Sequence, residues 1–231
     1  MKRNQSGFTL IEIAIVLVII GLLLGGVLKG QELINSAKVK NLATDFRNIP
    51  VFIYGYQDKF KALPGDDTAV ATTHLAGTAA VAATTPTSKQ GNGVIDGLWN
   101  SLTNTDESYL FWQHVRLAGL APGPTAIPGT PAVGDGYKPV NAAGGEIGIQ
   151  SNNGTFTTIM QNAASIAAPM TGTYIICSQG ILGKYVKQLD TTMDDGNTDT
   201  GSMRTADAAT GKSIATASVV DGSSYTVCMG I

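Results

Sequence analysis

Histidine, cysteine, aromatic side chains and charge are all scarce in this sequence. Two histidines and two cysteines occur in 231 residues, and aromatic residues make up 6%. Charged residues make up 14%, against about 25% in a typical soluble domain. The formal net charge of −2 argues against a basic nucleic-acid-binding protein, so we predict no direct nucleic-acid partner. The length fits one medium-sized domain.

Catalytic motifs are also missing. The sequence contains no HExxH, CxxC, GxSxG, GxGxxG or Walker motif. The histidines, His74 in an Ala/Thr-rich stretch and His114 in a predicted helix, are typical of surface or hydrogen-bonded structural side chains. We therefore expect a protein that is not an enzyme and requires no cofactor. An enzyme would need a catalytic cluster assembled from residues far apart in the chain.

One long hydrophobic run stands near the start of the chain. Phe8 to Leu28 is 21 residues long, and Glu12 is its only charge. As a helix it would span about 31 Å, which is enough to cross a bilayer. The run is longer than the apolar core of a cleaved secretory signal, which reaches about 15 residues. Glu12 argues against a plain permanent anchor, because a carboxylate in an apolar span needs a partner. We expect a segment that begins in the membrane and later packs against copies of itself.

The residues around the start of this run form a specific motif. The chain opens with the short basic leader Met1-Lys2-Arg3-Asn4-Gln5-Ser6-Gly7, and the next five residues are Phe8-Thr9-Leu10-Ile11-Glu12. This arrangement resembles the N-terminal signal of type IV prepilins and type II secretion pseudopilins. The resemblance implies that a membrane aspartyl peptidase, the prepilin peptidase, cuts between Gly7 and Phe8 and methylates the new N-terminal Phe8. It also implies that Glu12 pairs with the amino terminus of a neighbouring subunit.

Charge pairing gives the role of Glu12 a physical basis. Cleavage would create an α-amine on Phe8, and opposite charges attract far more strongly in hydrocarbon than in water. The amine and Glu12 are four residues apart, so they could also meet within one helix. A pair between subunits would form only when the next copy is in register, and it would then set the axial stagger of a filament. The sequence leaves both arrangements open.

The two cysteines indicate where the rest of the chain lies. Basic residues flank the apolar run on both sides, so charge does not decide its orientation. Cys177 and Cys228 are the only pair and stand far from the run, in a Gly- and Thr-rich region suited to an oxidising compartment. We predict a disulfide between them and an inner-membrane protein that spans the membrane once. Its N-terminus would be cytoplasmic, and its bulk would be periplasmic or, after assembly, part of an extracellular filament.

Apolar periodicity continues beyond the predicted membrane span. Apolar residues recur at spacings of three and four, as in an amphipathic helix, at Leu42, Phe46, Ile49, Ile53, Tyr56, Phe60 and Leu63. We predict one helix from Phe8 to about Lys61, with a kink at Pro50 and an end at Leu63-Pro64-Gly65. The predicted divisions are a cleaved leader at 1–7, a transmembrane and assembly helix at 8–28, its amphipathic continuation at 29–63, and an extracytoplasmic globular domain at 64–231.

The globular part is predicted to be mostly β. The stretch 68–90 is predicted to be a surface excursion, and 121–136 a Pro/Gly linker. A helix is expected from Asn104, as its cap with Glu107 three residues on, to Gly119. Strands are expected at Glu146–Gln150, Thr155–Ile159, Thr173–Ser178, Tyr185–Leu189 and Ser224–Met229, the first two joined at Asn153-Gly154. The predicted class is α+β, a pilin-like long N-terminal helix packed on an antiparallel sheet.

An acidic segment near the C-terminus is a candidate metal site. Its oxygen-bearing side chains are Asp190, Asp194, Asp195, Asn197 and Asp199. Calcium takes six to eight oxygen ligands, and some pseudopilins are similar in holding calcium in a C-terminal loop. An EF-hand is not supported, because Ala206 occupies the position of its bidentate glutamate. The alternative is a solvated Asp-Gly turn without metal.

These observations predict a structural subunit of a type IV pilus or a type II secretion pseudopilus. Its expected protein partners are copies of itself, related pilins, the prepilin peptidase and the inner-membrane assembly machinery. Before assembly it is also expected to contact the membrane. The alternative is a permanently membrane-anchored periplasmic protein that binds a ligand through its acidic loops. The sequence does not distinguish a major pilin, a minor pilin and a pseudopilin.

Overall fold

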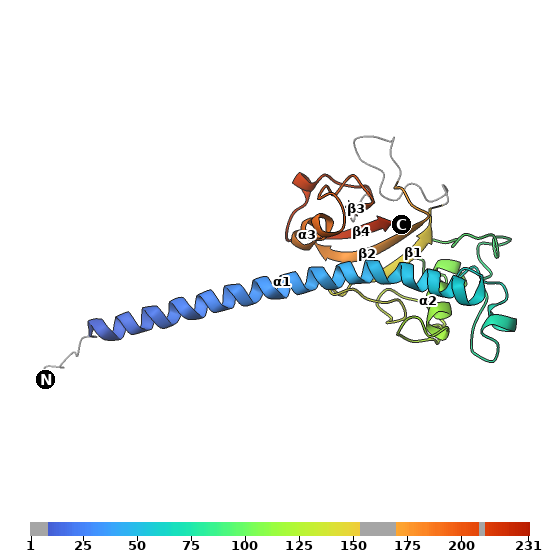
Figure 1. Cartoon of the computed structure of the whole chain (residues 1–231), viewed down its shortest axis with the longest axis horizontal. Helices are drawn as coiled ribbons and strands as arrows, with labels where there is room; N and C mark the ends of the chain where they lie inside the picture. Colours follow the sequence, from blue (N-terminus) through green and yellow to red (C-terminus); the bar gives the residue numbers. More distant parts are fainter. Residues whose placement is uncertain (1–8, 153–169, 208–210) are drawn as a thin grey trace. The chain divides into compact units, whose positions relative to one another are not determined.

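The computed structural model describes residues 9–152, 170–207 and 211–231 (Figure 1). The chain forms two compact units, Met1–Lys38 and Val39–Ile231. Helix α1, Leu10–Phe60, is 51 residues long, continues through Pro50 and contributes to both units. It ends at Phe60, and the next residue, Lys61, has a left-handed φ of 54°. The predicted long helix is therefore confirmed over the described residues.

The part of α1 in the first unit is apolar and uncovered. By length and composition it is the one helix, among the residues that the structure describes, able to cross a membrane. The hydrophobic side chains of this segment are exposed, with Leu10 at 93% and Leu22 at 73%. A helix that is hydrophobic on all sides requires lipid or other helices around it.

The second unit is built on a four-stranded antiparallel sheet. Its strands are β1 (Ile147–Ser151), β2 (Tyr174–Leu182), β3 (Met203–Ala206) and β4 (Ser224–Gly230), in the order β1-β2-β4-β3. The second half of α1 packs on this sheet through one stripe of buried side chains, spaced by three and four residues: Val39, Leu42, Phe46, Ile49 and Ile53. The predicted α+β class is confirmed.

Two shorter helices complete the core of the second unit. Helix α2 is Glu107–Leu117 and α3 is Gly183–Met193 (Figure 1). Both contribute side chains to the main apolar core. Asp106, rather than the predicted Asn104, precedes the first turn of α2. The Asn104 amide donates instead to the carbonyl of Pro128, at 3.2 Å. The capping prediction was therefore wrong.

The segment 185–189 is helical, not the predicted strand. Tyr185, Val186, Leu189 and Asp190 are the buried positions of α3. These positions are one, three or four residues apart, as on one face of a helix. The strand prediction rested on alternation over only five residues, which is too short to distinguish a strand from a helix. Strand β3 was not predicted, and the proposed strand Thr155–Ile159 and its turn lie outside the described residues.

The stretch 68–90 contributes to a small core of its own. It contains the π-helix η1, Val70–His74. Val70, Leu75 and Ala80 are buried against Tyr56 of α1 and Ala118 after α2. The prediction that this stretch is only a surface excursion was therefore wrong. Its buried apolar residues are isolated in an Ala/Thr-rich segment, so the sequence shows no periodicity that would have predicted their burial. A 3-10 helix, η2 (Thr216–Ser218), precedes β4.

Candidate functional site

Thr9 and Glu12 form a capping box at the start of α1. The backbone N–H and the hydroxyl of Thr9 both donate to Glu12 Oε2 at 2.8 Å, and the Glu12 N–H lies 3.3 Å from Thr9 Oγ1. Glu12 therefore has a partner within its own chain, because its carboxylate accepts from the backbone N–H of Thr9 while the Thr9 hydroxyl oxygen accepts from the backbone N–H of Glu12. The T-x-x-E spacing was a readable signal for this contact.

The predicted cleavage site adjoins this capping box. Gly7 and Phe8 both lie outside the described residues, so the pairing of Glu12 with the Phe8 amine stays a prediction. Farther along, a Cβ added to Gly21, Gly25 or Gly26 would meet no described atom within 4 Å. These glycines are points at which another helix could approach the backbone closely.

The acidic segment is arranged as a hydrogen-bonded turn after α3. Asp194 Oδ2 accepts from the N–H of Met203 at 2.8 Å. The Asp195 carboxylate accepts from the Asn197 N–H at 2.8 Å and from the Thr200 hydroxyl at 3.0 Å. Within the described part of the chain, no three His, Cys, Asp or Glu side chains are placed to hold a metal ion together. The observed geometry therefore matches the alternative of an Asp-Gly turn.

Asp190 differs from the other acids of this segment because it is buried. It lies in α3 with 1% exposure, and the backbone N–H groups of Gly196 and Asn197 face its carboxylate. Burial, with the negative charges of Asp194 and Asp195, raises the pKa of Asp190 to about 6. The backbone hydrogen bonds from Gly196 and Asn197 offset part of this cost of burial.

Cys177 and Cys228 form the predicted disulfide. They stand directly opposite each other in the β2–β4 pair, with Cα atoms 4.0 Å apart, and both are fully buried. The bond closes a loop with a sequence separation of 51 residues. It thus links β2 and β4, the two central strands of the described sheet.

We expect the double substitution Cys177→Ala/Cys228→Ala to lower the free energy of unfolding by about 4 kcal/mol, because the loop constrains the unfolded chain. Urea unfolding of the full chain in detergent micelles measures the change. Addition of reductant to the unsubstituted chain during unfolding should reproduce most of this loss of unfolding free energy. Free thiols in protein purified without reductant would contradict the prediction.

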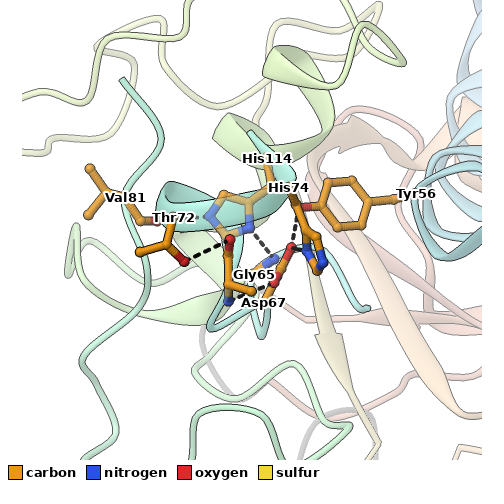
Figure 2. Close-up of polar contacts among 8 residues, drawn as sticks. Tyr56, Gly65, Asp67, Thr72, His74, Val81 and His114 are labelled. Carbon is orange, nitrogen blue, oxygen red and sulfur yellow. Dashed lines mark hydrogen bonds and ion pairs between the residues drawn. The ribbon is translucent and has the colours of Figure 1, made fainter. Parts of the chain in front are cut away.

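A polar cluster stands at the C-terminal end of α1 (Figure 2). Asp67 Oδ2 accepts from the Tyr56 hydroxyl at 2.7 Å and lies 2.6 Å from His74 Nδ1. The N–H of Ala69 donates to the other oxygen, Oδ1, at 2.9 Å. Asp67 therefore joins α1 to the segment that contains η1.

His114 of α2 holds the same region from the other side (Figure 2). Its Nδ1 accepts from the N–H of Gly65 at 2.9 Å, and its Nε2 lies 2.8 Å from the carbonyl of Val81. These partners place the proton on Nε2 and none on Nδ1. Burial lowers the pKa of His114, so the ring is neutral. Both histidines have structural contacts, as the sequence predicted.

Comparison with known proteins identifies the N-terminal segment. Residues 2–28 match the prokaryotic N-terminal methylation motif, which is of the prepilin type and is typical of type IV pilins and pseudopilins. This motif implies a pilin-like protein that is processed by prepilin peptidase and assembled, and such proteins are usually structural and not enzymatic. No curated protein and no solved structure matches the chain.

Proposed function

We propose that this chain is a structural subunit of a type IV pilus or a type II secretion pseudopilus. In this proposal prepilin peptidase cuts between Gly7 and Phe8, and the subunits polymerise through the first part of α1. The methylation motif over residues 2–28 is the observation that carries the proposal.

The chemistry of the first part of α1 supports this route. Its apolar surface is uncovered on all sides in the single chain, so lipid must cover it before assembly and neighbouring helices after it. The capping box reduces the cost of Glu12 in the membrane, because the carboxylate already accepts two hydrogen bonds from Thr9. In a filament, the α-amine of a neighbour would offer Glu12 a charged donor, which makes a stronger hydrogen bond than a neutral one.

The same features suggest where the chain lies in the cell. We place the leader in the cytoplasm, α1 across the inner membrane and the second unit outside the cytoplasm, in the periplasm or in an extracellular filament. The buried disulfide supports this orientation, because disulfides persist in oxidising compartments. The partners would be copies of this chain, related pilins, the prepilin peptidase and the inner-membrane assembly machinery.

A permanently anchored periplasmic binding protein is the second candidate. It is favoured by one observation, that Glu12 is satisfied within its own chain and needs no second subunit. Its leader would stay attached, and its function would reside in the second unit.

Filament imaging separates the two candidates. The full chain would carry a short epitope tag after Ile231, and labelled surface appendages or pseudopili would be examined by electron microscopy. Label along filaments or at their tips is the expected result. Label confined to the cell envelope, in cells whose other filaments assemble normally, would contradict the proposal.

We further propose that the acidic segment binds calcium. Asp190 supports this, since a bound cation would stabilise a buried carboxylate that lies beside the negative charges of Asp194 and Asp195. Binding would require Asp194, Asp195, Asn197 and Asp199 to turn toward Asp190, because their present hydrogen bonds hold a turn.

Calcium should therefore raise the melting temperature of the full chain in micelles, because a ligand that binds only the folded state stabilises it. Magnesium should raise it less, since it retains its waters more strongly. The effect should disappear in Asp195→Ala and persist in the control Asp58→Asn, which alters an exposed residue of α1. Identical melts with calcium and with chelator would favour the metal-free turn.

A further inference from the structure

Three acidic side chains gather beneath the start of α2. Asp66 comes from the turn after α1, Asp96 from the loop before α2, and Glu107 is the first residue of α2. Their exposures are 5%, 3% and 0%. The charged groups that affect the pKa of Glu107 are Asp66 and Asp96, and both are acids that raise it. His114, which contacts the same turn through Gly65, is neutral. Three buried negative charges together would be strongly unfavourable.

Glu107 and Asp66 hold one loop from two sides. Glu107 Oε2 accepts from the N–H of Asp96 at 2.7 Å. The two oxygens of Asp66 accept from the N–H groups of Gly91 and Gly93, the latter at 2.8 Å. The loop 91–96 is thus fixed at its beginning by Asp66 and at its end by Glu107.

The other oxygen of Glu107 is the unusual feature. Oε1 is buried and has no hydrogen-bond partner among the residues that the structure describes. As a carboxylate oxygen it would be an acceptor without a donor, which is costly. As the O–H of a carboxylic acid it would be a donor facing Asp66, an acceptor.

The end of this loop and the residues that follow it contact the edge of the sheet at β1. Among the strands that the structure describes, β1 lies at one edge of the sheet. The N–H of Ser151 donates to the carbonyl of Ile95 at 3.0 Å, and the N–H of Ile95 donates to Ser151 Oγ at 2.8 Å. The N–H of Trp99 donates to Gln150 Oε1 at 3.0 Å. Ile95 is fully buried in the main core. An uncovered edge strand would be a template for pairing with other chains.

We propose that Glu107 carries a proton in the folded protein and that this proton locks the segment 91–99 over the edge of β1. Loss of the proton would add a negative charge beside Asp66 and Asp96. The loop would then loosen, and the edge of β1 would become accessible.

The ionisation of Glu107 is consistent with a proton that holds the segment 91–99 over β1. Burial, followed by the charges of Asp66 and Asp96, raises the pKa of Glu107 to about 8 from an ordinary value of 4.5. The unfolded chain therefore loses this proton near its ordinary pKa, whereas the folded chain keeps it to about pH 8. Its contribution to stability is complete below the lower value and falls as the pH rises between the two. Above about pH 8 the folded protein itself is ionised at this position.

Hydrogen exchange on the full chain in detergent micelles tests the proposal. Protection factors, corrected for the intrinsic exchange rate, would be compared from about pH 6.5 to about pH 9.5 for peptides covering 91–99 and 147–151. We expect protection to fall by about thirtyfold across this range, since about 1.5 pH units beyond a pKa of about 8 lowers the protonated fraction by about that factor. In Glu107→Gln protection should not fall, because the amide still accepts from Asp96 and donates toward Asp66 at every pH.

The control Asp58→Asn should behave as the unsubstituted chain, because Asp58 is exposed and lies outside the cluster. Equal losses of protection in the unsubstituted chain and in Glu107→Gln would overturn the proposal, and so would protection that is independent of pH in both.

Carboxyl ¹³C NMR keeps the test valid if Glu107→Gln does not fold. The chain has four glutamates, Glu12, Glu32, Glu107 and Glu146, so selective labelling gives four signals. One of the four carboxyl signals should titrate near pH 8. The same signal should still be present in the Glu12→Gln chain, in which the membrane glutamate is removed. Titration of all remaining signals below about pH 6 would overturn the proposal.

Discussion

A chain with Gly7→Trp is expected to keep its leader, with processing reduced to an undetectable level. The prepilin-type motif implies a peptidase that accepts a small residue before the bond to Phe8. A bulky indole at this position would exclude the leader from such a site, whereas the apolar run that inserts the chain is unchanged. The protein should therefore accumulate in the membrane as the precursor and form no filaments.

The mass of the membrane-bound chain measures this result, because removal of residues 1–7 changes it by the mass of the leader. Gly7→Ala is the matched control, since it keeps a small side chain and should retain a substantial part of the processing. Normal cleavage of the Gly7→Trp chain would contradict the assignment of the motif to this position.

Glu12→Ala should insert at least as well as the unsubstituted chain but should assemble poorly. A carboxylate near the middle of a membrane helix costs roughly 2.5 to 3.5 kcal/mol, so removal of Glu12 favours insertion. Assembly would lose the partner for the Phe8 amine of the neighbouring subunit. Membrane fractionation measures insertion, and the yield of sheared filaments measures assembly, with an expected loss of at least about tenfold, the equivalent of about 1.4 kcal/mol per contact.

Glu12→Gln separates the charge of Glu12 from its place in the capping box. Glutamine is accepted at this position of a capping box, so the hydrogen bonds with Thr9 can persist without the charge. If the ion pair drives assembly, Glu12→Gln should fail as Glu12→Ala does. Assembly of Glu12→Gln at the unsubstituted level would assign the effect to helix capping instead. Assembly of both variants at that level would show that the pair has no role.

Periodicity over many residues made the largest element predictable. The apolar stripe of α1 repeats over several turns, so a helix is the only regular structure that buries Leu42, Phe46 and Ile53 together. The disulfide was predictable because the chain has only two cysteines. The strands around Cys177 and Cys228 were also predicted. β2 begins with five consecutive buried residues, and only the first four residues of β4 alternate between buried and more exposed positions.

Short segments and long-range contacts were not predictable in the same way. Five residues around Val186 fit a strand or a helix equally well, and only packing against the sheet selects the helix. The cluster of Asp66, Asp96 and Glu107 joins three separate segments of the chain, and no local pattern indicates that they meet. The capping box of Thr9 and Glu12 is local, and its spacing could have been recognised from the sequence.

The mass and identity of the mature N-terminus test the central claim most directly. The full chain would be isolated from the membrane and from filaments of its native host and examined by N-terminal peptide mass spectrometry. We expect a first residue of N-methylated Phe8, with residues 1–7 absent. An intact N-terminus that includes Lys2, Arg3 and Gly7 in the assembled or membrane-bound protein would contradict the account and would favour the permanently anchored binding protein.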